Sequence, residues 1–118
     1  MAKIMVVDDA EFLRLRISKM LAGEGHQIVE AENGVVAVNA YKDEKPDLVF
    51  MDITMPEMDG LSALKEIRGL DPKAKVVMLT ALGQESIVLE AIKSGARDFV
   101  VKPFERDRVI GAIEKLLG

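Results

Sequence analysis

Five short apolar runs alternate along the chain with longer stretches in which apolar residues recur at helical spacing. The runs lie at residues 4–7, 28–29, 48–51, 76–79 and 99–101. Polar or turn residues bound most of them, which is typical of buried parallel strands. Between and after the runs, the spacing predicts helices near residues 13–21, 35–43, 61–69, 85–94 and 109–117.

The second of these helices leaves two interpretations open. Val35, Val36 and Val38 are β-branched and would suit a strand equally well. The ends of the predicted helices are marked by glycine, which is the residue favoured just after the last turn of a helix. Three glycines lie where helices are expected to end: Gly25, Gly69 and Gly95.

Strand and helix therefore alternate five times. This order predicts an α/β fold in which a doubly wound, five-stranded parallel sheet carries helices on both faces. Right-handed crossovers restrict the topology further. Because internal repeats, low-complexity segments and long linkers are absent, we expect one domain over residues 1–118.

Composition narrows the function classes. The chain has no cysteine, which excludes disulfides and thiolate metal sites, and His26 alone cannot build a histidine-rich site. The formal net charge of −4 gives no basic face, so we expect no direct binding of nucleic acid. No apolar run reaches the ~18 residues needed to cross a bilayer. Without a signal peptide at the N-terminus, we expect a cytoplasmic protein that does not associate with membranes.

Residues able to carry chemistry follow or end four of the five predicted strands: Asp8, Asp9, Asp52, Thr80 and Lys102. In an open α/β sheet, ligands bind outside the carboxyl ends of the strands. We therefore expect three carboxylates, a hydroxyl and an ammonium group to converge on one edge of the sheet.

Such a cluster favours a hard cation. Two carboxylates ~5 Å apart repel each other by roughly 3 kcal/mol at an effective dielectric near 20. Oxygen ligands without histidine or cysteine favour Mg²⁺. Lys102 and Thr80 could then neutralise and hydrogen-bond the oxygens of a phosphoryl group. A carboxylate can also act as the nucleophile and form an acyl phosphate.

Each of these residues also has an ordinary interpretation. Asp8 and Asp9 could cap the first helix, since aspartate is favoured there. Asp52 could be an ordinary loop aspartate, Thr80 a residue that merely ends a strand, and Lys102 a solvated charge. A purely structural α/β domain of that kind would show no Mg²⁺ dependence and form no phosphoprotein.

Four stretches in this order and spacing resemble the response-regulator receiver family. They are residues 6–9 (VVDD), 51–60 (MDITMPEMDG), 80–81 (TA) and 95–104 (GARDFVVKPF). The resemblance covers almost the whole chain. It implies a flavodoxin-like (CheY-like) sheet of strand order 2-1-3-4-5 in a receiver, or response regulatory, domain. It also implies a phosphorylation-activated regulator of a two-component system.

The resemblance implies a role for each matching residue. Asp52 would accept a phosphoryl group from a histidine kinase. Asp8, Asp9 and Asp52 would bind Mg²⁺ together with the backbone carbonyl of Thr54. The chain would not be an enzyme beyond catalysing its own phosphoryl transfer and autodephosphorylation.

The resemblance also implies roles for residues in or after the fourth and fifth predicted strands. Thr80, Ala81 and Lys102 would contact the phosphoryl group. Thr80 and Phe99 would form the switch, the ring of Phe99 swinging inward on activation. The bond between Lys102 and Pro103 would be cis, as it often is in the family.

More narrowly, residues 9–14 (DAEFLR) and 81–86 (ALGQES), with no output domain, resemble single-domain chemotaxis regulators of the CheY kind. This implies a chemotaxis-type histidine kinase as one partner. A flagellar motor switch protein, an adaptor or a phosphatase would be the other, and we expect a monomer. Phe99 departs from the tyrosine of some chemotaxis members. Thr54 and Leu82 lack a carboxylate or amide to orient an attacking water, which favours a long-lived phosphoryl group.

Two alternatives remain at this point. A phosphorelay carrier would pass the phosphoryl group to a histidine phosphotransfer protein and would use the same residues. A small aspartyl-phosphate phosphohydrolase usually needs a second acidic residue two positions after the nucleophile. Thr54 stands there, which counts against that alternative.

Overall fold

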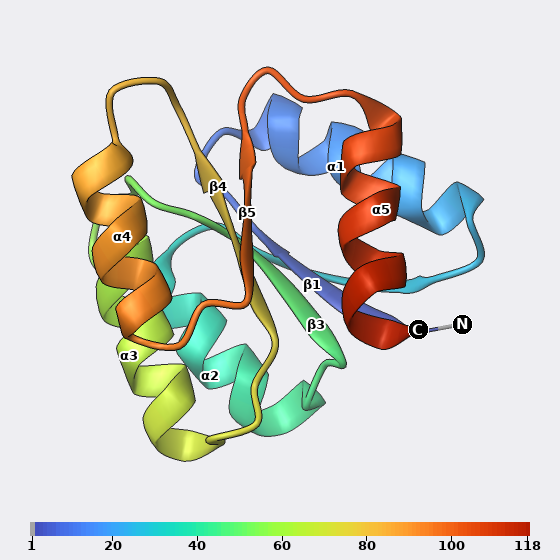
Figure 1. Cartoon of the computed structure of the whole chain (residues 1–118). Coiled ribbons are helices and arrows are strands. Elements are labelled where there is room, and N and C mark those ends of the chain that lie inside the picture. The colour runs from blue at the N-terminus through green and yellow to red at the C-terminus, as the bar shows by residue number, and fades with distance from the viewer. Residues whose placement is uncertain (1) are drawn as a thin grey trace.

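The computed structural model describes residues 2–118 and forms a single α/β unit (Figure 1). All five strands are parallel and lie in the order β2-β1-β3-β4-β5, which confirms the expected topology. The strands are β1 (Lys3–Val7), β2 (Gln27–Ala31), β3 (Leu48–Asp52), β4 (Val76–Thr80) and β5 (Asp98–Val101). The helices are α1 (Glu11–Gly23), α2 (Gly34–Glu44), α3 (Gly60–Leu70), α4 (Glu85–Lys93) and α5 (Arg106–Leu117).

Two apolar layers hold the helices to the sheet. Helices α1 and α5 cover one face, and α2, α3 and α4 cover the other (Figure 1). Successive strand residues alternate between the layers, since side chains of a strand point to opposite faces. In β1, Met5 and Val7 join the layer under α2 and α3, whereas Ile4 and Val6 pack toward α1 and α5.

The central and edge strands differ in burial. Every residue of β3 and β4 is buried, as expected for strands covered on both faces. The expectation of buried strands is wrong for the edges. In β5, Phe99 and Val101 are exposed, and β2 buries only Ala31 fully. Because β2 and β5 are the edge strands, each has a neighbouring strand on one side only, and part of its side chains reaches solvent.

The α2 segment is a helix, which decides between the two interpretations of residues 35–43. Asn33 lies at its N-cap and accepts a hydrogen bond from the backbone N–H of Val36 at 2.9 Å. Such a cap satisfies a donor that the first turn leaves free. Val38 and Tyr41 are buried on its inner face. Capping and burial of this face outweigh the β-branched composition.

Glycine marks the end of two of the three helices for which it was expected. Gly25 and Gly95 adopt positive φ angles of 90° and 109° just beyond α1 and α4. The expectation for Gly69 is wrong, because α3 continues to Leu70 and Asp71 is the residue that follows its last turn. Within residues 2–118 the helices are 9 to 13 residues long, and none has the length and apolar character to span a bilayer.

Candidate functional site

The predicted acidic residues lie close together at the carboxyl ends of the strands. Asp8 and Asp9 follow β1, and Asp52 is the last residue of β3. Each of the three offers a carboxylate oxygen within 4.8 Å of the others. Asp8 and Asp52 are buried, whereas Asp9 is exposed. The cluster therefore consists of two buried carboxylates and one exposed carboxylate.

Lys102 connects the two buried carboxylates. It directly follows β5, and its Nζ lies 3.0 Å from Asp8 Oδ2 and 3.0 Å from Asp52 Oδ1. Its backbone N–H donates to the carbonyl of Thr80 at 2.7 Å, which ties this end of β5 to β4. The peptide bond between Lys102 and Pro103 is cis. The structure thus brings the ammonium group and the acidic cluster together.

Neither aspartate after β1 caps the first helix. The N-cap of α1 is Ala10, and no side chain accepts a hydrogen bond from the first turn. Asp8 Oδ1 instead accepts from the backbone N–H of Ala10 at 2.9 Å. Its own carbonyl accepts from Arg14 Nη1 at 2.7 Å. Asp8 is thereby held rigidly, with its second carboxylate oxygen facing Lys102.

The environment of Asp52 changes its protonation. Burial raises the pKa of Asp52 from 3.8 to about 6, and the negative charges of Asp8 and Asp9 act in the same direction. The hydrogen bond and charge of Lys102 lower it only in part. For Lys102, burial alone would lower the pKa, but its hydrogen bonds to Asp52 and Asp8 outweigh burial and raise it.

The donor set fits a hard divalent cation. Three carboxylates and one ammonium group leave a net negative charge at the cluster. All of the available ligand atoms are oxygens, which suits Mg²⁺ better than a softer metal. A cation between Asp9 and Asp52 would relieve the repulsion that raises the pKa of Asp52. The acidic cluster is therefore able to hold a metal ion.

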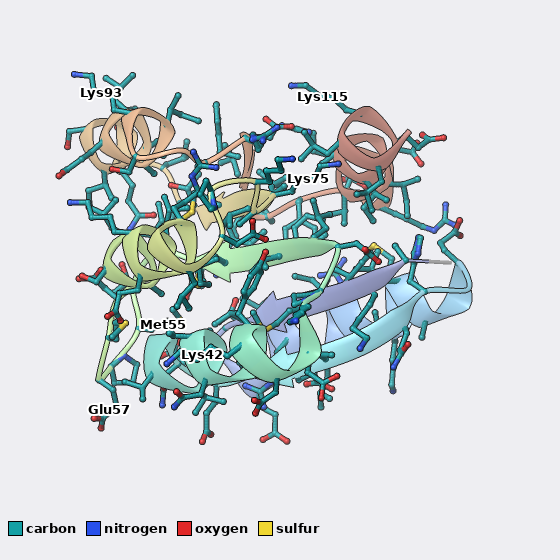
Figure 2. All side chains as sticks on the ribbon, turned by 90° about the horizontal axis from the view of Figure 1, so that it is seen from below. Lys42, Met55, Glu57, Lys75, Lys93 and Lys115 are labelled. Carbon is teal, nitrogen blue, oxygen red and sulfur yellow. The ribbon has the colours of Figure 1, made fainter. Side chains whose placement is uncertain are left out.

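A loop of residues 53–59 joins the end of β3 to the start of α3. In Figure 2, β1 and β3 point toward the loop that carries Met55 and Glu57. The loop returns to the sheet where Gly60 begins α3 and donates its N–H to the carbonyl of Ile53 at 2.7 Å. A Cβ atom at Gly60 would lie 2.0 Å from the carbonyl oxygen of Asp52. A side chain at position 60 would therefore displace the backbone of Asp52.

Thr80 ends β4, and its hydroxyl donates to Gln84 Oε1 at 3.0 Å and toward the carbonyl of Ala81 at 3.3 Å. The N–H of Ala81 donates to the same Gln84 oxygen at 2.7 Å. Gln84 Nε2 donates to the hydroxyl of Thr54 at 3.1 Å. Thr80, Ala81 and Thr54 are thus joined through a residue that the sequence reasoning missed. Its signal was faint: an amide-bearing side chain in the loop that follows Thr80.

Phe99 lies in β5 beside an apolar hollow. Its side chain is on the surface, with 38% of the residue exposed. The hollow has a volume of about 330 Å³. It is lined by Thr80, Ala81, Leu82, Glu85, Val88, Leu89, Ile92, Phe99 and Val101. Thr80 and Phe99 thus border one space between α4 and β5.

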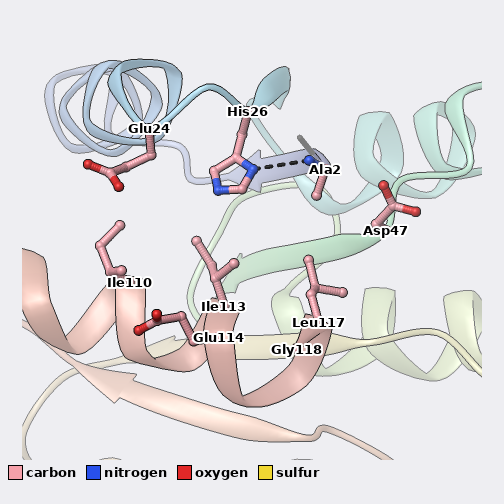
Figure 3. Close-up of a pocket in the computed structure, with 9 residues that line it drawn as sticks. All are labelled: Ala2, Glu24, His26, Asp47, Ile110, Ile113, Glu114, Leu117 and Gly118. Carbon is pink, nitrogen blue, oxygen red and sulfur yellow. Dashed lines mark hydrogen bonds between the residues drawn. The ribbon is translucent and has the colours of Figure 1, made fainter.

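A second cavity, of about 520 Å³, lies at the opposite edge of the sheet (Figure 3). There His26 Nδ1 accepts a hydrogen bond from the backbone N–H of Ala2 at 3.1 Å, facing Ile113 and Leu117 of α5. This cavity is far from the acidic cluster, because it borders the amino ends of the strands. We assign the chemistry to the carboxyl edge, where charged groups from three strands meet.

Comparison with known proteins agrees with this geometry. Residues 4–114 match the family model described as response regulator receiver domain. The chain is 55% identical over 117 residues to the chemotaxis protein CheY of Bacillus subtilis, covering 98% of each chain. It is 49% identical to the chemotaxis protein CheY of Thermotoga maritima, covering 97% of this chain and 96% of that protein.

Solved structures show the same fold. A response regulator receiver domain protein from Clostridium thermocellum superposes with a TM-score of 0.95 at 27% identity, covering 99% of this chain and 94% of that chain. CheY in the CheX-CheY-BeF3-Mg+2 complex from Borrelia burgdorferi superposes with a TM-score of 0.92 at 35% identity. That match covers 98% of this chain and 89% of the other.

Proposed function

This chain belongs to the response regulator receiver family, and on that premise we propose that Asp52 accepts a phosphoryl group with the help of Mg²⁺. Phosphorylation-activated response regulation is the function of this family. One observation carries the assignment to Asp52. Its carboxylate shares Lys102 with Asp8 at 3.0 Å on each side, while Asp9 completes an acidic cluster. A nucleophile, a positive charge and a metal site are thereby within reach of one phosphorus atom.

The transfer uses few groups. A carboxylate oxygen of Asp52 forms a bond to phosphorus while the bond from phosphorus to a nitrogen of the donor histidine breaks, and the leaving imidazole takes up a proton. Lys102 neutralises one phosphoryl oxygen, and the donors of Thr80 and Ala81 hydrogen-bond another. Asp8, Asp9, Asp52 and the carbonyl of Thr54 would hold Mg²⁺, which supplies positive charge for the remaining oxygen.

The chain's own catalysis ends there. We assign to it self-catalysed transfer and autodephosphorylation, with a separate histidine kinase as the source of the phosphoryl group. The phosphohydrolase alternative is disfavoured because position 54 carries a hydroxyl, and this hydroxyl accepts a hydrogen bond from Gln84. A carboxylic acid, which that chemistry uses to protonate the leaving group, is missing from this position.

The output is a changed surface. Phosphorylation replaces one negative charge at Asp52 with about two and adds oxygens that attract Thr80. A hydrogen bond to a charged oxygen contributes on the order of 1.5–3 kcal/mol, enough to shift a two-state equilibrium 10- to 100-fold. If Thr80 moves toward the phosphoryl group, the hollow beside Phe99 gains room for the ring. The surface of α4, β5 and α5, around residues 83–95 and 99–112, is where partners would detect the change.

The named relatives suggest the pathway. Proteins called chemotaxis protein CheY match over nearly their whole length. We therefore assign the chain to chemotaxis, with a chemotaxis-type histidine kinase upstream. A motor switch protein, an adaptor or a phosphatase would bind downstream, and the CheX-CheY-BeF3-Mg+2 complex among the structural neighbours supports binding to a protein partner. A phosphorelay role would use the same site and differ only in the partner.

Intact-mass measurement tests the proposal. The protein is treated with a small phosphodonor such as acetyl phosphate, with and without Mg²⁺. We expect a mass increase of one phosphoryl group that requires Mg²⁺ and is absent in Asp52→Asn. Asp47→Asn, at the opposite edge of the sheet, serves as the matched control and should behave like the wild type. Equal phosphorylation of Asp52→Asn would reject Asp52 as the acceptor.

A further inference from the structure

Gln84 occupies the N-cap of α4, yet capping does not explain its side chain. Its backbone carbonyl accepts from Val88 at 3.0 Å, which starts the helix. The side chain makes no hydrogen bond to the first turn. Serine, threonine, aspartate and asparagine are the residues that cap helices well, and glutamine is not among them. The hydrogen bonds of this side chain therefore have a role other than capping.

The carboxamide of Gln84 turns back over the end of β4 instead. Its Oε1 accepts from the N–H of Ala81 at 2.7 Å and from the hydroxyl of Thr80 at 3.0 Å. The orientation of the amide follows from chemistry, because a backbone N–H can only donate and must face the oxygen. One oxygen atom thus takes both donors.

The other end of the carboxamide reaches across to the loop after β3. Its Nε2 donates to the hydroxyl of Thr54 at 3.1 Å. The same side chain therefore links the loop before α4 to the loop that follows Asp52. Gln84 is half-buried in this position, whereas Thr54 is exposed.

We propose that Gln84 is a positioning residue that occupies the phosphoryl-oxygen position in the unphosphorylated protein and must leave when Asp52 is loaded. The inference rests on the proposed function, which assigns the donors of Thr80 and Ala81 to a phosphoryl oxygen. A hydroxyl has one proton, so Thr80 cannot fully donate to the carboxamide and to a phosphoryl oxygen at once. The carboxamide oxygen of Gln84 thus stands where that phosphoryl oxygen would be.

Release of Gln84 has a second consequence. When Oε1 loses its donors, Nε2 also loses the geometry that holds it against Thr54. The link between the two loops is then broken, and the first residues of α4 are freed from the loop after β3. Loading of Asp52 and movement at the start of α4 are therefore opposed by the same three hydrogen bonds.

Removing the carboxamide should favour the loaded state. In Gln84→Ala, Thr80 and Ala81 have no carboxamide to which they donate. No hydrogen bonds of this kind then have to be broken before a phosphoryl mimic binds. Each such bond corresponds to about a 3- to 10-fold change in an equilibrium. We expect Gln84→Ala to bind beryllofluoride at least about 3-fold more tightly than the wild type, at saturating Mg²⁺. Gln84→Glu keeps an acceptor and adds a negative charge, so it should bind the anion more weakly than the wild type.

Calorimetric titration with beryllofluoride compares these variants with the wild type, with Gln27→Ala as the matched control. Gln27 is an exposed glutamine on β2, and its loss should leave the affinity unchanged. If Gln84 merely ordered the loop, Gln84→Ala would leave the donors of Thr80 and Ala81 without a fixed position. The affinity for beryllofluoride would then fall. Affinity in Gln84→Ala that equals or falls below that of the wild type would overturn the inference.

Two further proteins separate the inference from its premise. The gain in Gln84→Ala should shrink in a Thr80→Ala background, because one of the two competed donors is then missing. An undiminished gain would contradict the role given to Thr80. Asp52→Asn should bind no beryllofluoride. If the wild type also binds none, the proposed function fails and the inference with it, whereas binding by the wild type without a gain in Gln84→Ala rejects the inference alone.

Discussion

The carboxyl group of Asp52 lies between one ammonium group and two other carboxyl groups. Because burial and the charges of Asp8 and Asp9 outweigh Lys102, ionised Asp52 disfavours the folded state in the absence of metal. The same arrangement favours any ligand that brings positive charge. The charges that lower the stability of the metal-free fold at this residue are therefore the same charges that attract a cation.

The raised pKa of Asp52 predicts that the effect of Asp52→Asn on stability depends on pH. The folded pKa of Asp52 is about 6 and the ordinary value is 3.8. A raised folded pKa stabilises the fold below the unfolded value, and this contribution is lost as the pH rises through the folded value. In metal-free buffer, Asp52→Asn should therefore gain stability over the wild type between about pH 4 and pH 7. A shift of two pKa units corresponds to at most about 3 kcal/mol.

Urea unfolding at several pH values, with chelator present, measures this difference. The advantage of Asp52→Asn should be small near pH 4, reach its maximum by pH 7, and shrink when Mg²⁺ is added. An advantage that does not vary with pH would contradict the electrostatic account of Asp52.

Most residues of the site could be predicted because they end strands. The positions of Asp8, Asp52, Thr80 and Lys102 follow from four short apolar runs, since parallel strands end at the same edge. Gln84 could not be predicted in this way, because its contacts depend on the path of a loop. The sequence shows that positions 54 and 82 carry no amide, but it does not show that the amide of Gln84 reaches the hydroxyl of Thr54.

At the scale of the element, α3 shows two opposite uses of glycine. Gly60 begins the helix against the backbone of Asp52, where an added Cβ would lie 2.0 Å from a carbonyl oxygen. Gly69 lies in the last turn with no atom within 4 Å of an added Cβ. The first glycine is required by close packing, and the second only lowers helix propensity.

Two alanine substitutions in α3 should therefore change stability in opposite directions. Gly60→Ala should lower the free energy of unfolding by about 1–3 kcal/mol through overpacking. Gly69→Ala, its matched control, should raise it by up to about 1 kcal/mol, because alanine is the better helix former. Chemical denaturation measures both, and equal effects would contradict the account of the α3 start.

Helix ends were predictable to within three residues, the largest difference being the start of α5, but residues 35–43 could not be assigned as helix or strand. Residues 35–43 leave helix and strand open, and only the cap by Asn33 and the burial of Val38 and Tyr41 decide. Gly69 misled for the related reason that a glycine in an exposed last turn costs too little to stop a helix. Tertiary packing, which a local pattern does not contain, settles both cases.

At the scale of the molecule, the site and the hollow beside Phe99 share Thr80. The hydroxyl of this residue faces Gln84 and the loop, and its side chain borders the hollow between α4 and β5. A change at Asp52 can therefore reach the surface of α4 and β5 through one side chain. This coupling requires the hydroxyl, since a methyl group in its place cannot be drawn toward a phosphoryl oxygen.

Replacing Thr80 should uncouple loading from the surface change. In wild-type protein, beryllofluoride should shift the amide resonances of residues 99–101 in ¹⁵N spectra. Thr80→Ala should still bind beryllofluoride at Asp52 but show much smaller shifts in β5. Ser86→Ala, which removes an exposed hydroxyl from α4, is the matched control and should behave like the wild type. Full shifts in Thr80→Ala would reject the coupling.

The proposed function depends on the acidic cluster binding a cation, and a calorimetric Mg²⁺ titration of the wild type, Asp9→Asn, Asp52→Asn and Asp47→Asn tests this most directly. We predict one Mg²⁺ per chain, affinity at least tenfold weaker in Asp9→Asn and Asp52→Asn, and unchanged affinity in Asp47→Asn. Equal Mg²⁺ affinity in all four proteins, or no binding by the wild type, would contradict the account.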